Sequence, residues 1–200
     1  MAETVPATNI GEREIGYVLL ALLSDEAKDQ IVSLQQELDR ELPGALWLMP
    51  RDALHVTLCE IIQPKDYGED KTQLFERNRQ AFEDVSSRVL AGFGEIAVQF
   101  DTIEASSGAI IIRGQDDGSF NAIRKRLVAQ LSLPEATKRP PDIVHSSIAR
   151  YTKSVELGNV EQIVDAHRID LQEQVTAFKL VRCSVQPLLE YETLQTYRLK

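Results

Sequence analysis

Hydrophobic residues follow two different periods along the chain, and each period predicts one kind of secondary structure. Compact apolar runs rich in Val, Ile, Leu and Tyr are typical of buried strands. They predict strands over residues 14–24, 53–62, 95–104, 108–113, 143–151, 175–186 and 189–199. Apolar side chains repeated on one helical face predict amphipathic helices. These helices are expected over residues 25–41, 70–90, 158–167 and from a cap at Asp117 or Ser119 to just before Pro134.

Turn and capping residues mark where these elements begin and end. Ser24 or Asp25 is a favourable N-cap for the first helix, and Pro43–Gly44 ends it. Residues 1–13 show neither period and are expected to form a disordered N-terminal tail. No low-complexity linker divides the rest, so residues 14–200 are expected to fold as a single bilobal domain. Loops are expected over residues 45–52, 64–68 and 138–141.

One unit of sequence occurs twice along the chain. It consists of an apolar strand, an amphipathic helix, a loop, and a strand with the pattern h-H-x-[ST]-h, where h is an apolar residue. The first copy runs from Tyr17 to His55, and the second runs from Ile110 to His145. The repeat predicts two lobes related by a pseudo-twofold axis. The motif strands, around residues 53–62 and 143–151, are then expected to face each other.

The two motifs place the same chemical groups in each lobe. Residues two apart on a strand share a face, so His55 projects with Thr57 and His145 projects with Ser147. A neutral histidine can take a proton from an attacking water, and an imidazolium can give one to a leaving oxygen. The hydroxyls can donate hydrogen bonds to phosphate oxygens, where charge gathers in the transition state. The pattern therefore predicts phosphoester chemistry that needs no metal.

A single histidine in a strand is more often a packed or surface residue, but two such motifs at equivalent places in a repeat are far less expected by chance. Three further residues are softer candidates for substrate binding. Trp47 can stack on a base at the cleft mouth, although a tryptophan before a strand is more often in the core. Tyr151 shares the parity of His145 on the predicted strand. Arg150 has the opposite parity but sits at the strand end, where it can reach a phosphate.

Composition and charge narrow the class of protein. Hydrophobic residues make up 43% of the chain and charged residues 26%, as in ordinary globular proteins. The net charge of −9 argues against binding long duplex nucleic acid but allows a small anionic substrate. No apolar run is long enough to span a membrane and no signal peptide is visible, so a cytoplasmic location is expected. The protein is also expected to be a monomer. The basic residues near the second motif, Arg124 among them, are interpreted as solvated surface charges.

Cysteine and histidine usage indicates no cofactor or metal site. Cys59 and Cys183 form no C-x-x-C pair and are expected to be buried free thiols. The chain has three histidines and no H-E-x-x-H pattern, so no local zinc site is visible. A G-x-x-x-x-G-K-[ST] nucleotide-binding loop is also absent from the sequence.

With these motifs, the chain resembles the 2H phosphoesterase superfamily, the LigT-like group of 2′,3′-cyclic phosphodiesterases and so-called 2′-5′ RNA ligases. That family is defined by two H-x-[TS]-h motifs, matched here by His55/Thr57 and His145/Ser147. The resemblance implies an α+β fold of two pseudo-twofold lobes, with antiparallel sheets lining a central cleft and helices outside. The chain departs from the family at residues 59–62, where many members have an apolar, glycine-containing continuation. Further similar stretches are residues 47–54, 178–182 and 191–194.

The resemblance implies hydrolysis of 2′,3′-cyclic phosphates of nucleotides or RNA ends, with one histidine as base and the other as acid. Which histidine takes which role stays open, because the repeat makes the two nearly equivalent. An ATP-driven ligase is not expected, since residues 65–68 do not form the lysine motif of such ligases. Two alternatives remain: trimming of RNA 3′ ends or cleavage of 2′-5′ linkages, and non-catalytic binding of nucleotides or RNA ends.

Overall fold

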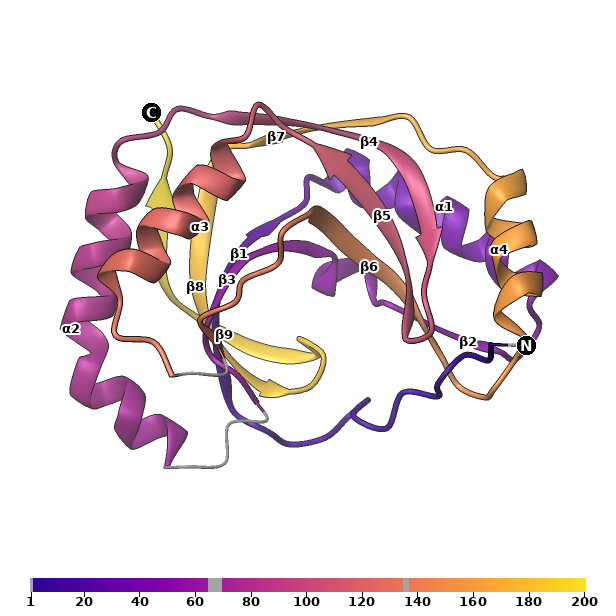
Figure 1. The fold of residues 1–200 in the computed structure, drawn as a ribbon, viewed down its shortest axis with the longest axis horizontal. Helices are drawn as coiled ribbons and strands as arrows, with labels where there is room; N and C mark the ends of the chain where they lie inside the picture. The colour runs from indigo at the N-terminus through magenta and orange to yellow at the C-terminus, as the bar shows by residue number, and fades with distance from the viewer. Residues whose placement is uncertain (1, 65–69, 135–136) are drawn as a thin grey trace.

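The computed structural model describes residues 2–64, 70–134 and 137–200. Strands and helices alternate along most of this part of the chain (Figure 1). In order they are β1 (Gly16–Leu22), α1 (Asp25–Glu41), β2 (Leu46–Leu48), the 3₁₀ helix η1 (Arg51–Ala53), β3 (His55–Ile62), α2 (Lys71–Leu90), β4 (Ile96–Ala105), β5 (Ala109–Gln115), α3 (Ser119–Gln130), β6 (Val144–Tyr151), α4 (Leu157–Ala166), β7 (Leu171–Val175), β8 (Ala177–Val185) and β9 (Glu190–Arg198).

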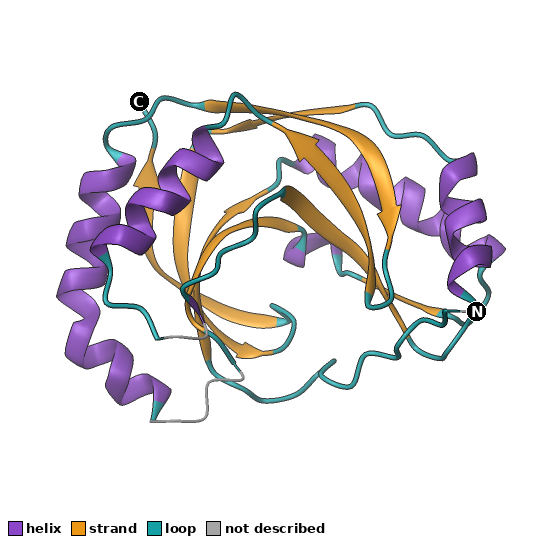
Figure 2. Ribbon diagram, in the orientation of Figure 1, coloured by secondary structure: helices purple, strands orange, loops and turns teal. Residues whose placement is uncertain are grey.

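The strands form two antiparallel sheets, and the helices lie outside them (Figure 2). The four-stranded sheet has the order β3-β1-β8-β9, and the five-stranded sheet has the order β2-β6-β5-β4-β7. Helices α2 and α3 lie together on the side of the first sheet, and α1 and α4 lie on the side of the second (Figure 1). The predicted α+β fold with two antiparallel sheets is confirmed.

The two sheets repeat the same strand order. Leaving out the short β2, β6-β5-β4-β7 matches β3-β1-β8-β9 position by position, so the two motif strands β3 and β6 are equivalent. Each sheet forms one lobe, and the helix inside each copy of the repeat packs against the sheet of the other lobe. Helix α1 follows β1 but contacts β6 and β7, whereas α3 follows β5 but contacts β3. This exchange interlocks the lobes, and β3 and β6 themselves are in contact.

Most predicted elements are present, with small differences that have local causes. Ser24 caps α1 as predicted, and its hydroxyl accepts a hydrogen bond from the backbone N–H of Ala27 at 3.2 Å. The N-cap of α3 is Gly118 rather than Asp117 or Ser119. Strands β2 and β7 were not predicted, because three and five residues are too few to show a clear period. The loop predicted over residues 64–68 lies, after position 64, outside the described residues.

The N-terminal segment differs from the predicted disordered tail. The backbone N–H of Thr4 donates to the carbonyl of Val155 at 2.9 Å, and that of Ala7 donates to Tyr151 at 2.8 Å. Thr4 is also buried, with 2% of its surface exposed. Residues 2–7 are thus anchored along the end of β6 and the segment that follows it, and residues 11 and 12 exchange backbone hydrogen bonds with Gln186. Backbone hydrogen bonds of this kind require no apolar pattern, which explains why the hydrophobic periods do not reveal them.

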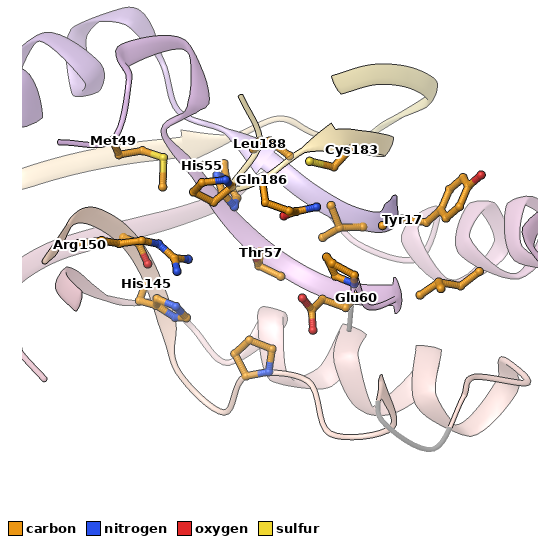
Figure 3. A pocket seen from close by; sticks show the side chains of 17 residues that line it. Tyr17, Met49, His55, Thr57, Glu60, His145, Arg150, Cys183, Gln186 and Leu188 are labelled. Atoms are coloured by element: carbon orange, nitrogen blue, oxygen red, sulfur yellow. The ribbon is translucent and has the colours of Figure 1, made fainter. Parts of the chain in front are cut away.

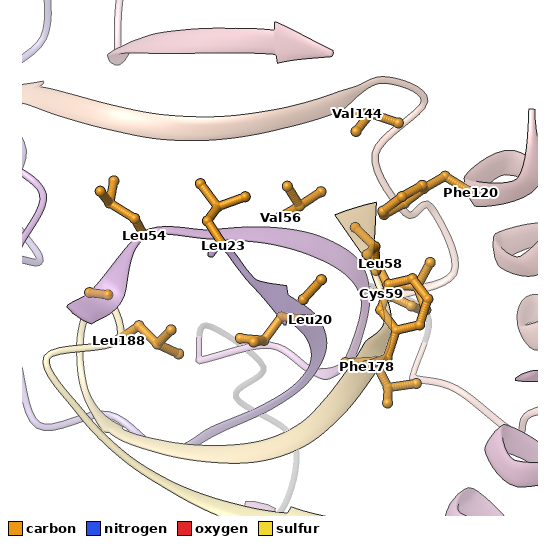
Figure 4. Close-up of a cluster of buried hydrophobic side chains, with 14 of the residues drawn as sticks. Leu20, Leu23, Leu54, Val56, Leu58, Cys59, Phe120, Val144, Phe178 and Leu188 are labelled. Carbon is orange, nitrogen blue, oxygen red and sulfur yellow. The ribbon is translucent and has the colours of Figure 1, made fainter. Parts of the chain in front are cut away.

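A continuous apolar core lies behind the motif strands. Leu54, Val56 and Leu58 are each at most 1% exposed, and Figure 4 shows them among the buried side chains around β3. Phe120 of α3 packs edge-on against Phe178 of β8, with ring centroids 5.5 Å apart, and so fixes α3 to the four-stranded sheet. The apolar face of α2 is buried, at Phe75, Phe82, Val85 and Val89, and so are both cysteines, which are free thiols.

Candidate active site

The two motifs line one cavity. His55 and Thr57 of β3 and His145 and Ser147 of β6 all border a pocket of about 270 Å³ (Figure 3). The residues between them on each strand point the other way and are buried. The structure therefore brings together all four groups that the motifs predicted, in the face-to-face arrangement expected from the repeat.

An irregularity in pairing follows each motif and changes which residues reach the pocket. In the β1–β3 pair, Leu19 lies opposite Cys59 whereas Leu20 lies opposite Thr57, so Leu58 is an extra residue. Such a bulge reverses the alternation of side chains beyond it. Glu60 consequently joins His55 and Thr57 in lining the pocket.

The second motif strand has its bulge at the equivalent place. In the β5–β6 pair, Ile110 lies opposite Ala149 and Ile111 opposite Ser147, so Ile148 is the extra residue. Arg150 therefore lines the pocket with His145 and Ser147. Each motif histidine is thus followed, five positions later, by a charged side chain on the same wall: an acidic one in the first lobe and a basic one in the second.

The bulge determines which of the two weaker substrate-binding candidates on β6 faces the pocket. Tyr151 was predicted to share the face of His145, but it is fully buried and does not border the pocket. Burial raises the pKa of its phenol to about 12. Arg150, whose parity had counted against it, is the residue that borders the pocket. Trp47 pairs with Arg150 across the β2–β6 ladder and packs half-buried against the core; it is not among the residues bordering the pocket, whereas Met49 is.

His55 is held in one orientation by the end of η1, directly before its strand. Its Nδ1 lies 2.7 Å from the carbonyl oxygen of Ala53, an acceptor only, so Nδ1 carries the proton. The Nε2 lone pair of the neutral ring is then free for another partner. Burial lowers the pKa of His55, and the nearby charges of His145 and Arg150 lower it further, against the opposing effect of the Ala53 carbonyl.

His145 has a related but less apolar environment. Burial lowers its pKa most, and the carbonyl of Ile143, at the position equivalent to Ala53, raises it. That carbonyl does not make a well-formed hydrogen bond, since Nδ1 of His145 has no partner among the described residues. The carboxylates of Asp142 and Glu104 also raise the pKa, whereas Arg124 lowers it. No carboxylate among the described residues acts in this way on His55.

Arg150 carries an unused donor beside the two histidines. Its Nη1 donates to the side-chain oxygen of Asn9 at 3.4 Å, and its buried Nε has no partner among the described residues. Burial lowers the pKa of the guanidinium, yet an arginine stays protonated at any ordinary pH. The pocket thus holds a fixed positive charge with hydrogen-bond capacity to spare.

Arg124 was interpreted as a solvated surface charge, but only 2% of its surface is exposed. It reaches from α3 into the other lobe, where its Nη2 donates to the carbonyl of Thr57 at 2.7 Å and its Nε to that of Leu58 at 2.9 Å. It therefore holds the bulge directly after the first motif. The guanidinium also lies 5.4 Å from the centre of the Phe120 ring.

Gln35 fixes the second bulge in the way that Arg124 fixes the first. It is buried on α1, and its amide donates to the carbonyl of the bulge residue Ile148 at 2.7 Å and to that of Met49 at 2.8 Å. Each exchanged helix therefore supplies one buried polar side chain that fixes the bulge of the opposite lobe. The sequence repeat pointed to the two helices but not to these two residues.

Nothing in the described ranges suggests a metal centre. No group of three or more His, Cys, Asp and Glu side chains in residues 2–64, 70–134 and 137–200 is placed to hold an ion. In the same ranges, no helix is both long and apolar enough to cross a membrane.

Comparisons with known proteins give a clear result for the fold. No family model matches the chain, and no curated protein matches it in sequence. Solved structures do match. TT0787 of Thermus thermophilus is 16% identical with a TM-score of 0.64, over 92% of this chain and 97% of that one. E. coli LigT complexed with phosphate is 15% identical with a TM-score of 0.65, over 94% and 99%. The MHV ns2 PDE domain is 14% identical with a TM-score of 0.51, over 89% and 96%.

The chain therefore has the fold of LigT along almost its whole length, as the resemblance of its motifs implied. Sequence identity is too low for these likenesses to establish more than the fold. Three of the similar LigT structures contain nucleotides: one contains 3′-AMP, one ATP and one NADP+.

Proposed function

We propose that this chain is a 2H phosphoesterase that hydrolyses 2′,3′-cyclic phosphates of nucleotides or RNA ends without a metal. One observation carries the proposal: two histidines, each with a hydroxyl two residues later, face one pocket from equivalent strands. Beside them lies the Nε of Arg150, which has no partner among the described residues. The LigT fold and the nucleotide complexes of LigT support the same function.

The environments of the two histidines support different roles in the two proton transfers. His55 is the base: its Nδ1–H is engaged by Ala53, and its lowered pKa keeps Nε2 unprotonated. His145 is assigned as the acid: burial and Arg124 lower its pKa, but of the two histidines it is the one near carboxylates, Asp142 and Glu104, which favour its protonated form. His55 takes a proton from the attacking water as the new P–O bond forms. His145 gives a proton to the ribose oxygen as one ring P–O bond breaks, leaving a nucleoside monophosphate.

Three further groups, the hydroxyls of Thr57 and Ser147 and the guanidinium of Arg150, bind the phosphate. Thr57 and Ser147 donate hydrogen bonds to the two non-bridging oxygens, one from each lobe. Arg150 supplies the positive charge that compensates the charge developing on those oxygens. The absence of a partner for its Nε among the described residues is consistent with this role, since an unused buried donor is costly unless a ligand satisfies it.

The size of the pocket favours a small substrate. At about 270 Å³ it lies near the lower end of the range for small-molecule sites, which suits one nucleotide or the last nucleotide of an RNA. The test is to incubate the purified chain with the four nucleoside 2′,3′-cyclic monophosphates and follow monophosphate formation. His55→Ala and His145→Ala are expected to be slower by about 100- to 10,000-fold.

Two other outcomes would replace the proposal. Turnover confined to 2′-5′- or 3′-5′-linked oligonucleotides would identify a linkage-cleaving or end-trimming enzyme. Tight nucleotide binding without turnover of either class would identify a binding protein.

The pH dependence is a second test of the proton transfers. The reaction needs His55 neutral and His145 protonated, so kcat/KM follows a bell bounded by the two apparent pKa values of the pair. Both pKa values are lowered in the free protein, so the optimum is expected on the acidic side of the ordinary histidine value of about 6.5. A profile that is flat across the histidine range would contradict paired acid–base catalysis.

A further inference from the structure

Glu60 extends the pocket beyond the reacting groups. In Figure 3, Arg150 lies beside the two histidines, and Glu60 lies on the opposite side of Thr57. Glu60 follows Thr57 along β3 and, because of the bulge at Leu58, faces the same cavity. A group held at the phosphate position and extending along β3 therefore meets the Glu60 carboxylate.

The carboxylate accepts one hydrogen bond, and no cation in residues 2–64, 70–134 and 137–200 affects its pKa. Among the described residues, the side chain of Gln63 is the one group that stabilises its charged form, through a hydrogen bond. Burial outweighs this bond and raises the pKa of Glu60. A half-buried carboxylate with one such partner keeps acceptor capacity for a ligand.

The walls around Glu60 suit a flat, uncharged ring. Ile62, Pro64 and Pro141 border the same cavity, with Val18 of the neighbouring strand. A second phosphate is disfavoured at this end, because it would face the Glu60 carboxylate, whose pKa is not affected by any cation of the described residues. A nucleobase satisfies both conditions, since its faces pack on apolar walls and its edge carries hydrogen-bonding groups.

We propose that Glu60 reads the base of the substrate and makes the site selective for guanine. This inference rests on one part of the proposed function, namely that the ligand of the pocket is a nucleotide. Guanine carries two neighbouring donors, N1–H and the N2 amino group, which match the two oxygens of one carboxylate.

The other bases do not present this pair. Adenine and cytosine place a ring acceptor beside their amino group, and uracil places carbonyl oxygens on both sides of its single N–H. Each would bring an acceptor against the carboxylate, and so lose one hydrogen bond and gain a repulsion. A good bidentate contact to a base is worth roughly 10- to 100-fold in discrimination.

Binding of the product nucleotides tests the inference independently of turnover. Dissociation constants of guanosine, adenosine, cytidine and uridine 3′-monophosphate are measured by titration calorimetry with the intact chain. Guanosine 3′-monophosphate is expected to bind about 10- to 100-fold more tightly than the uridine compound. Glu60→Gln offers one acceptor and one donor, and Glu60→Ala offers neither, so both are expected to bring the four constants to within about threefold of one another.

Glu12→Gln is the matched control, because it removes the same charge from an exposed residue that does not border the pocket. It is expected to keep the guanine preference, and thermal melting of each variant checks that the fold is intact. Equal binding of the four nucleotides, no measurable binding, or a guanine preference that survives in both Glu60 variants would overturn the inference. Failure of the proposed hydrolysis appears separately, as guanine-selective binding without turnover of any cyclic nucleotide.

Discussion

Replacing Arg124 by methionine tests whether an exchanged helix positions the first motif. The substitution keeps much of the side-chain length but removes the charge and both hydrogen bonds to the carbonyls of Thr57 and Leu58. Those carbonyls belong to the hydroxyl residue of the motif and to the bulge residue after it. The variant should therefore disturb the site from behind, because Arg124 contacts the backbone of Thr57 but does not itself border the pocket.

The expected loss of stability is smaller than the two bonds alone suggest. Hydrogen bonds from a charged donor contribute about 1.5–3 kcal/mol each, so their removal costs about 3–6 kcal/mol. Methionine also avoids the cost of burying a charge, which is several kcal/mol and opposes that loss. The free energy of unfolding is therefore expected to fall by about 1–3 kcal/mol.

Effects on catalysis distinguish positioning from simple stability. Thr57 loses the anchor of its carbonyl, and a displacement of about 1 Å can cost about 100-fold in rate. Arg124 also lowers the pKa of His145, so its removal raises that pKa toward the ordinary value. Since His145 is the proposed acid, the alkaline limb of kcat/KM is expected to move to higher pH.

The assay measures kcat/KM on a 2′,3′-cyclic nucleotide across pH, together with urea unfolding. Arg126→Met is the control, because Arg126 lies on the same helix with its guanidinium 5.0 Å from the centre of the Phe93 ring and does not border the pocket. It should leave both the rate and the pH profile unchanged. If Arg124→Met unfolds more easily but keeps the wild-type rate and alkaline limb, Arg124 is structural and the positioning argument is wrong.

Three further outcomes are expected. Tyr151→Phe should keep wild-type activity, because the phenol is buried away from the pocket. Arg150→Gln should lose about 100-fold or more in kcat/KM. A larger loss in Tyr151→Phe than in Arg150→Gln would contradict the bulge at Ile148. Thr57→Val and Ser147→Ala should each lose about 100- to 1,000-fold in kcat while keeping the shape of the pH profile. Activity should survive dialysis against EDTA, and a loss that zinc or magnesium restores would refute metal-independent catalysis.

Local sequence was enough to predict most of the helices and strands and to identify the two motifs. Periodicity located the helices and long strands, because each period reports which face of an element is buried. The repeat then paired His55 with His145, and the spacing within each motif paired each histidine with its hydroxyl. These conclusions depend on neighbours along one strand or helix, and spacing along the chain determines such neighbours directly.

The tertiary structure alone decided which charged residues belong to the site. Whether Arg150 or Tyr151 faces the pocket depends on one extra residue in the pairing of β6 with β5. Glu60 faces the pocket because of an equivalent extra residue in the pairing of β3 with β1. A bulge is a relation between two strands, so extrapolating the alternation of one strand misses it. The roles of Arg124 and Gln35 were not predicted, because their partners are backbone carbonyls of the opposite lobe. Every residue has a backbone carbonyl, so the sequence does not show which one a side chain will bind.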